Sequence, residues 1–110
     1  MCETKILTRT PLTEIDYCVK CRSVFLWHNN ILMTFSEDEF STFHSTLGQY
    51  DFSECSMLFS DKVHRISICT PYNAINLVFD LTQWLDLRQA MEEASCMKEI
   101  YALLHRPLSN

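Results

Sequence analysis

The chain has 110 residues and a net charge of −5, and its composition, 47% hydrophobic and 21% charged, is typical of a small globular protein with one core. Its nine Lys and Arg residues are scattered, so neither nucleic acid nor an anionic membrane surface is an expected partner. Its single glycine excludes the glycine-rich loops that bind nucleotide phosphates, and the lack of a membrane-helix or secretory-signal pattern predicts a cytoplasmic protein.

The first half of the chain predicts a β-hairpin followed by a helix. Residues 22–27 and 31–35 read as strands, the second with one buried face, and the two Asn residues between them suit a two-residue type I′ turn. Ser36 and Glu39 have the spacing of a capping box, which begins a helix. That helix carries an apolar stripe and then a residue suited to a left-handed cap: Phe40, Phe43, Leu47 and Gly48.

The same pattern recurs 44 residues later, so that Asp80 takes the position that Ser36 has in the first copy. Residues 66–71 align with residues 22–27, and a turn over residues 70–73 leads to a strand over 75–79. Asp80 and Gln83 repeat the capping box, and the helical stripe continues with Trp84, Leu87 and Met91. No glycine ends this helix, so we expect it to continue as far as the Arg106-Pro107 step.

These elements define an α+β fold. We predict a single domain over residues 1–110 that contains two ββα pseudo-repeats, over about 14–48 and 58–105. Each becomes βββα if a further strand precedes its hairpin, over residues 13–18 and 57–60. The hairpins are expected to join into one antiparallel sheet with both helices packed on one face, the second helix being the longer.

The second helix also carries a candidate interface. Four residues of its extra turns are expected to cover sheet that the shorter first helix leaves bare: Ala94, Met97, Tyr101 and Leu104. Leu85, Cys96 and Leu103 fall on the opposite side of the helix at 100° per residue. They are candidate contacts with a second copy of the chain, although scattered exposed apolar residues are common.

Six cysteines are too few for a disulfide scaffold, and in the cytoplasm they would be thiols. Cys18 and Cys21 flank two residues between strand-like segments, a spacing that lets two thiolates bind one Zn²⁺. Cys2 is a candidate third ligand, and the fourth is unknown. Candidates without a diagnostic spacing are His28, Cys55, His64 and Cys69. A redox dithiol and two thiols without a ligand role remain open as alternatives.

The sequence predicts no catalytic residues and no organic-cofactor site. The acidic run Glu37-Asp38-Glu39 suits the first turn of a helix, and no nucleophile elbow is present in the sequence. His44 is expected to be in solvent. Seven aromatic residues at strand or helix spacing are expected in the core: Phe25, Trp27, Phe35, Phe40, Phe43, Phe79 and Trp84.

The segments CETKILTRT, IDYCVKC and FLWHNNILMTFSEDEFSTF resemble a family of small uncharacterised proteins found mainly in Bacteroidota. Those chains share an early Cys, a C-x-x-C, an Asn-containing hairpin and an acidic-capped helix rich in Phe. The likeness covers residues 2–47 well and the remainder loosely, and Trp27-His28 departs from the smaller pair expected before the turn. The resemblance implies a bacterial cytosolic domain of unknown function, and it groups Cys2, Cys18 and Cys21 as candidate ligands.

Two functions from different classes therefore remain. The first is a non-enzymatic interaction module that binds a protein partner or forms a homodimer. The second is a small zinc-binding protein with a structural metal site at Cys18 and Cys21. A thiol-dependent enzyme has the least support.

Overall fold

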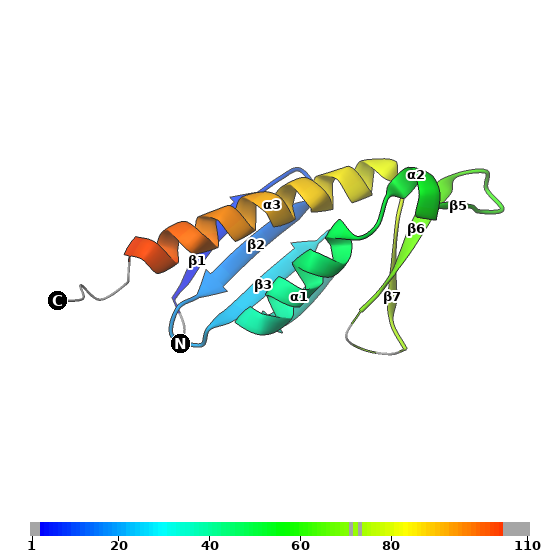
Figure 1. The fold of residues 1–110 in the computed structure, drawn as a ribbon. Helices are drawn as coiled ribbons and strands as arrows, with labels where there is room; N and C mark the ends of the chain where they lie inside the picture. Colours follow the sequence, from blue (N-terminus) through cyan, green and yellow to red (C-terminus); the bar gives the residue numbers. More distant parts are fainter. Residues whose placement is uncertain (1–2, 71, 73, 105–110) are drawn as a thin grey trace.

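The fold is described from a computed structural model for residues 3–70, 72 and 74–104. Within these residues the chain forms seven strands and three helices (Figure 1): β1 (Thr4–Arg9), β2 (Thr13–Cys18), β3 (Ser23–His28), β4 (Ile31–Ser36), α1 (Glu37–Gly48), α2 (Phe52–Cys55), β5 (Met57–Leu58), β6 (His64–Cys69), β7 (Asn76–Phe79) and α3 (Leu81–Leu104).

The four-stranded sheet has the order β1-β2-β3-β4 and is antiparallel throughout. Helix α1 packs on β3 and β4, and α3 lies along β1 and β2 (Figure 1). Helix α3 has 24 residues and α1 has 12. The predicted α+β class is therefore confirmed, with an antiparallel sheet, two helices on one of its faces and the second helix longer.

The core lies between this sheet and the two helices. Alternate strand residues point toward it, as the burial of Val24 and Leu26 on β3 and of Met33 and Phe35 on β4 shows. The helices contribute the predicted stripes, and all of these residues are buried: Phe40, Phe43, Leu47, Trp84, Leu87 and Met91. In the extra turns of α3, Ala94 is buried and Met97 and Tyr101 pack against the core. Leu104 is exposed, so its predicted role in covering the sheet is wrong.

Both predicted capping boxes are confirmed. The Ser36 hydroxyl accepts a hydrogen bond from the Glu39 N–H at 3.1 Å, and the Glu39 carboxylate accepts one from the Ser36 N–H at 2.8 Å. Asp80 and Gln83 make the same reciprocal pair at the start of α3, at 2.8 and 2.9 Å. Each box satisfies two N–H groups that the first turn of a helix leaves without partners.

The second hairpin does not join the first sheet as expected. β5, β6 and β7 form a separate three-stranded sheet. The apolar residues Leu77 and Phe79 of β7 are buried in the common core, and the Phe79 ring meets the His28 ring edge-on with centroids 5.1 Å apart. The apolar side chains of β7 therefore join the core, but β7 does not pair with the edge strand β4.

The register of the second hairpin also differs from the predicted alignment. Val24 pairs with Phe35 in the first hairpin, and Ile66 pairs with Phe79 in the second. The first strands of the two hairpins, β3 and β6, therefore correspond at an offset of 42 residues, as from Val24 to Ile66. This offset is smaller than 44 because the turn of the second hairpin is two residues longer. A shift of two preserves the strand period, so the same face is buried. Pro71 and Asn73 of the predicted turn lie outside the described residues.

Four local features differ from the sequence-based expectations. β1 and the short helix α2 are not predicted, and β1 is hidden by a bulge between Ile6 and Thr8 that breaks its alternation. The hairpin between β3 and β4 has the predicted two-residue loop, but only Asn29 has a positive φ (54°), which fits type II′ rather than type I′. Gly48 is the last residue of α1 and has no positive φ, so it is not a left-handed cap.

Candidate interaction surface

Of the two cysteines of the predicted metal site, Cys18 is the last residue of β2 and Cys21 lies in the turn between β2 and β3. Cys18 is fully buried and Cys21 is exposed, and the Cys21 N–H donates a hydrogen bond to Sγ of Cys18 at 3.4 Å. Arg22 follows with a φ of 53° and so takes the left-handed conformation that a glycine adopts more easily. Thr4 pairs with Cys18 across β1 and β2, and Cys2 lies outside the described residues.

The candidate fourth ligands do not approach this turn. His28 lies at the other end of β3 and faces the core, about 16 Å along the strand from its start. Cys55, His64 and Cys69 belong to α2 and the second sheet. Among residues 3–70, 72 and 74–104, no group of three or more His, Cys, Asp or Glu side chains is placed to hold a metal ion.

The predicted interface residues on α3 face outward. Leu85 and Leu103 are 58% and 64% exposed, and Cys96 is exposed. The leucines are 18 residues apart, which separates them by about 27 Å along the helix. No helix in the described part of the chain is long and apolar enough to cross a membrane.

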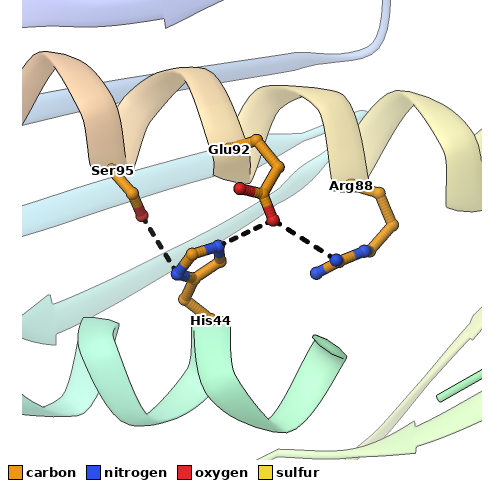
Figure 2. A network of polar contacts seen from close by, with 4 residues as sticks. All are labelled: His44, Arg88, Glu92 and Ser95. Carbon is orange, nitrogen blue, oxygen red and sulfur yellow. Dashed lines mark hydrogen bonds and ion pairs between the residues drawn. The ribbon is translucent and has the colours of Figure 1, made fainter. Parts of the chain in front are cut away.

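A polar network joins α1 to α3 (Figure 2). His44 reaches from α1 to contact the Ser95 hydroxyl at 3.2 Å and the Glu92 carboxylate at 3.0 Å, and Arg88 binds the same carboxylate oxygen at 3.3 Å. The expectation that His44 is in solvent is therefore wrong. Ser, His and Glu in a row resemble a catalytic triad, but Ser95 and Glu92 lie inside a helix whose N–H groups bond to its own carbonyls. These N–H groups cannot form an oxyanion hole, so the network connects helices.

Asp86 of α3 holds the turn between β1 and β2. Its carboxylate accepts hydrogen bonds from the hydroxyls of Thr10 at 2.8 Å and Thr13 at 2.7 Å, and from the Leu12 N–H at 3.4 Å. Because the Thr13 proton goes to Asp86, Nδ1 of His28, 2.9 Å from the same hydroxyl, must be the donor in that contact. Burial lowers the pKa of His28, so this ring is a neutral structural link.

The far end of α3 is held by a similar contact. Glu37 accepts a hydrogen bond from the Tyr17 hydroxyl at 2.6 Å and forms an ion pair with Lys98 at 3.0 Å. The Tyr17 bond lowers the pKa of Glu37, and burial raises the pKa of Tyr17 to about 12. The acidic run lies in the first turn of α1, as the sequence predicts, and Glu37 also connects α1 to β2 and α3, which the sequence does not predict.

The face of the four-stranded sheet opposite the helices carries exposed apolar side chains, which is unusual for such a face. Trp27 and Leu32 are neighbours across β3 and β4 and are 44% and 45% exposed, and Ile6 on β1 is 48% exposed. Phe25 lies on the same face, between Trp27 and the β2–β3 turn, and is partly buried. An antiparallel sheet with one face in water normally carries polar residues there. We call Ile6, Asp16, Phe25, Trp27 and Leu32 the open sheet face.

Asp16 lies in the middle of this face. Its neighbours across the strands are Ile6 on β1 and Phe25 on β3, and its Oδ1 atom is buried and makes no hydrogen bond. Burial, and then the charge of Glu14, raise the pKa of Asp16 to about 6. Glu14 itself is paired with Arg9 at 2.8 Å. The face therefore combines apolar side chains with one carboxylate, that of Asp16, which forms no ion pair with the described residues.

The sequence contains the signal for this face, but our interpretation assigned it to the core. Residues 24–27 (VFLW) are apolar at successive positions, and successive strand residues point to opposite faces. Val24 and Leu26 are the buried pair, so Phe25 and Trp27 must lie on the other face. The prediction that Phe25 and Trp27 are core residues is therefore wrong, because the sheet has helices on only one face.

The fold and these surfaces define a small α+β protein with one sheet face covered by helices and the other face open. The chain belongs to a family of unknown function (DUF6686), whose model matches residues 1–106. This membership confirms the resemblance to an uncharacterised family and assigns no activity; the Bacteroidota origin stays a prediction. No curated protein and no solved structure matches the sequence at a significant level.

Proposed function

We propose that the protein is a non-enzymatic, cytoplasmic interaction module that binds another protein through the open sheet face. The observation that carries the proposal is the adjacency of Trp27 and Leu32, with Ile6 on the same face, each with about half of its surface exposed. Large exposed aromatic and aliphatic side chains that lie together are typical of binding surfaces, and Trp is enriched among residues that dominate binding energy.

The outer side of α3 is a weaker candidate surface. Leu85 and Leu103 are more exposed than Trp27. They are too far apart to form one patch, and Glu92 lies between them on the same side of the helix. A contiguous apolar centre is what interfaces share. A homodimer through Leu85, Cys96 and Leu103 is therefore an alternative outcome of the experiment below.

Site-specific photo-crosslinking tests the proposal. A benzophenone amino acid replaces Leu32 on the open sheet face or, as the control, Val78, an exposed strand residue on β7. In extracts of the cells that make the protein, we expect a discrete adduct from position 32 only. Excess wild-type protein should compete with this adduct, and a variant with Trp27→Thr and Leu32→Thr should not.

The mass of the adduct separates the alternatives. Twice the mass of the chain indicates a homodimer, and any other mass indicates a different partner. Equal labelling from positions 32 and 78, or adducts that the double variant removes as well as wild type does, would contradict docking at this face.

A structural zinc site at Cys18 and Cys21 is the second candidate. It is supported by the Cys21 N–H bond to Sγ of Cys18, because backbone N–H groups that bond to a thiolate stabilise its charge. Thr4, at the start of β1, pairs with Cys18. Native mass spectrometry of protein purified without chelator should find one Zn²⁺, which Cys18→Ser removes and the exposed-site control Cys55→Ser retains. A metal-free mass would rule the site out.

A further inference from the structure

The partner's secondary structure follows from how a sheet face can be covered. The backbone groups of β2 and β3 are used by the ladders on both of their sides, so an extended peptide on the open sheet face would find no backbone partners there. Extended peptides add to sheet edges instead. A helix satisfies its own backbone bonds, and α1 and α3 already cover the opposite face in this way.

The size of the face matches one short helix. Four strands at about 4.8 Å and six residues at about 3.3 Å give a face of about 20 by 20 Å. This length corresponds to about 13 residues of helix.

The chemistry of the partner follows from Asp16. This carboxylate lies between Ile6 and Phe25, and Arg9, the cation whose charge acts on it, is bound to Glu14. A partner that covers Asp16 without a cation would either bury its charge further or force it to take up a proton, and both are unfavourable at neutral pH. A Lys or Arg on the partner removes that cost and adds a charge-assisted interaction with the carboxylate.

We infer that the open sheet face binds an amphipathic helix of about 13 residues from another protein, with a Lys or Arg that reaches Asp16 from the edge of its apolar stripe. This inference rests on the proposed function, since it specifies the partner of the same face.

A second copy of the chain fits this description poorly. Its long helix, α3, has four acidic residues (Asp86, Glu92, Glu93 and Glu99) and two basic residues (Arg88 and Lys98). Arg88 is bound to Glu92, and Lys98 is bound to Glu37. An α3 helix from a second copy would therefore bring negative charge to Asp16.

Two synthetic 14-residue peptides test the inference. They share one apolar stripe of Leu and Ala and have Gln elsewhere, and they differ only in having Lys or Glu at two positions that flank the stripe. Binding is followed by anisotropy of the labelled peptide and by Trp27 emission, because the other tryptophan, Trp84, is buried. We expect the Lys peptide to bind at least tenfold more tightly than the Glu peptide.

Matched variants assign that preference to one residue. Asp16→Asn should weaken binding of the Lys peptide about tenfold. Asp38→Asn, the same change at an exposed position on α1, should leave this affinity unchanged. The Lys peptide should also bind more weakly as the pH falls from 7.5 to 5.5, and Asp16→Asn should remove that dependence. Glu14 and Arg9, the charged groups near Asp16, are retained in both variants.

The results separate this inference from the function on which it rests. Suppose that both peptides bind equally, and that Trp27→Thr abolishes this binding whereas Asp16→Asn leaves it unchanged. This result would overturn the cationic partner and support the docking face. Equal weakening by Asp16→Asn and Asp38→Asn would show general charge attraction and would also overturn the cationic partner. Binding of neither peptide, with a crosslinked adduct still formed from position 32, would overturn the helical partner, and binding that Trp27→Thr leaves unchanged would overturn the docking face itself.

Discussion

The two halves of the molecule use the same local elements and place their helices differently. In both halves a hairpin leads through a capping box into a helix, with Ser36 and Asp80 in equivalent positions. The equivalent pairs Val24 and Ile66, and Phe35 and Phe79, are all buried. Helix α1 packs on its own hairpin, β3 and β4, whereas α3 contacts its own hairpin, β6 and β7, less extensively than it covers β1 and β2. Local signals start each helix, but the apolar surface it can cover decides where it packs.

The cause of this difference lies in the strands that precede each hairpin. β1 and β2 each have six residues and carry buried side chains such as Leu7 and Ile15. β5 has two residues, both exposed. The first hairpin is therefore part of a four-stranded sheet about 19 Å wide, which one helix of about 10 Å diameter cannot cover. Helix α3 packs on the half of the sheet that α1 leaves bare.

The largest effect should come from the residue that fixes α3 in this position. Asp86 corresponds to Thr42 of α1, 44 residues earlier, and Thr42 is exposed. Asp86→Ala should lower the free energy of unfolding by about 3 kcal/mol, because the hydroxyls of Thr10 and Thr13 lose a charged acceptor. Urea unfolding followed by circular dichroism measures this loss. Thr42→Ala is the control and should change stability by less than about 0.5 kcal/mol; similar losses in the two variants would contradict a special role for Asp86.

The sequence predicts these two halves unequally. Capping boxes and apolar stripes are short-range signals, and the residues from Ser36 to Leu47 and from Asp80 to Met91 fold as their spacing predicts. The separate second sheet, and the open sheet face, depend on which surfaces meet after the elements form. The role of Asp86 is also a long-range property, since its partners lie more than 70 residues away. No residue pattern within the second helix marks it.

A substitution of His28 tests the ends of the two hairpins. His28 corresponds to Thr70, whose hydroxyl is bonded to carbonyls of its own longer turn, those of Tyr72 and Ile75. The two-residue turn after His28 offers no such carbonyls. His28→Thr should therefore destabilise the protein by about 2 kcal/mol at pH 7.5, through loss of ring packing and of the Thr13 contact. His64→Thr, at an exposed histidine, should have little effect in the same urea unfolding experiment.

The same variant should change the response to acid. Burial lowers the pKa of His28 in the folded protein, so its contribution is fully present above the unfolded value of about 6.5 and is lost as the pH falls below it. The raised pKa of Asp16 acts in the opposite direction, because stability increases as the pH falls through about 6. The comparison is therefore made in an Asp16→Asn background, where adding His28→Thr should reduce the loss of stability between pH 7 and pH 5. An unchanged loss would exclude His28 as its source.

The two capping boxes should contribute equally. Ser36→Ala and Asp80→Ala each remove a side chain that accepts an N–H bond of the first helical turn, at 3.1 and 2.8 Å. Each should cost about 1 kcal/mol in thermal or urea unfolding, despite the different lengths of the helices. A much larger loss for Asp80→Ala would mean that its role extends beyond the cap and that the two helix starts are not equivalent.

The smallest effect concerns the point where the helices diverge in length. Gly48 ends α1, and its equivalent in α3 is Glu92, where the helix continues. Gly48 has no positive φ, and an added Cβ would meet only the Arg88 guanidinium, at 4.0 Å. Gly48→Ala should therefore stabilise the protein by about 0.5 kcal/mol through lower entropy of the unfolded chain, which raises the melting temperature by about 3 °C. A gain would show that the glycine is not required to end α1. A loss would mean that α1 needs its flexible last residue to turn the chain toward α2, so that the difference in length would be encoded at this position rather than by the surface available to each helix.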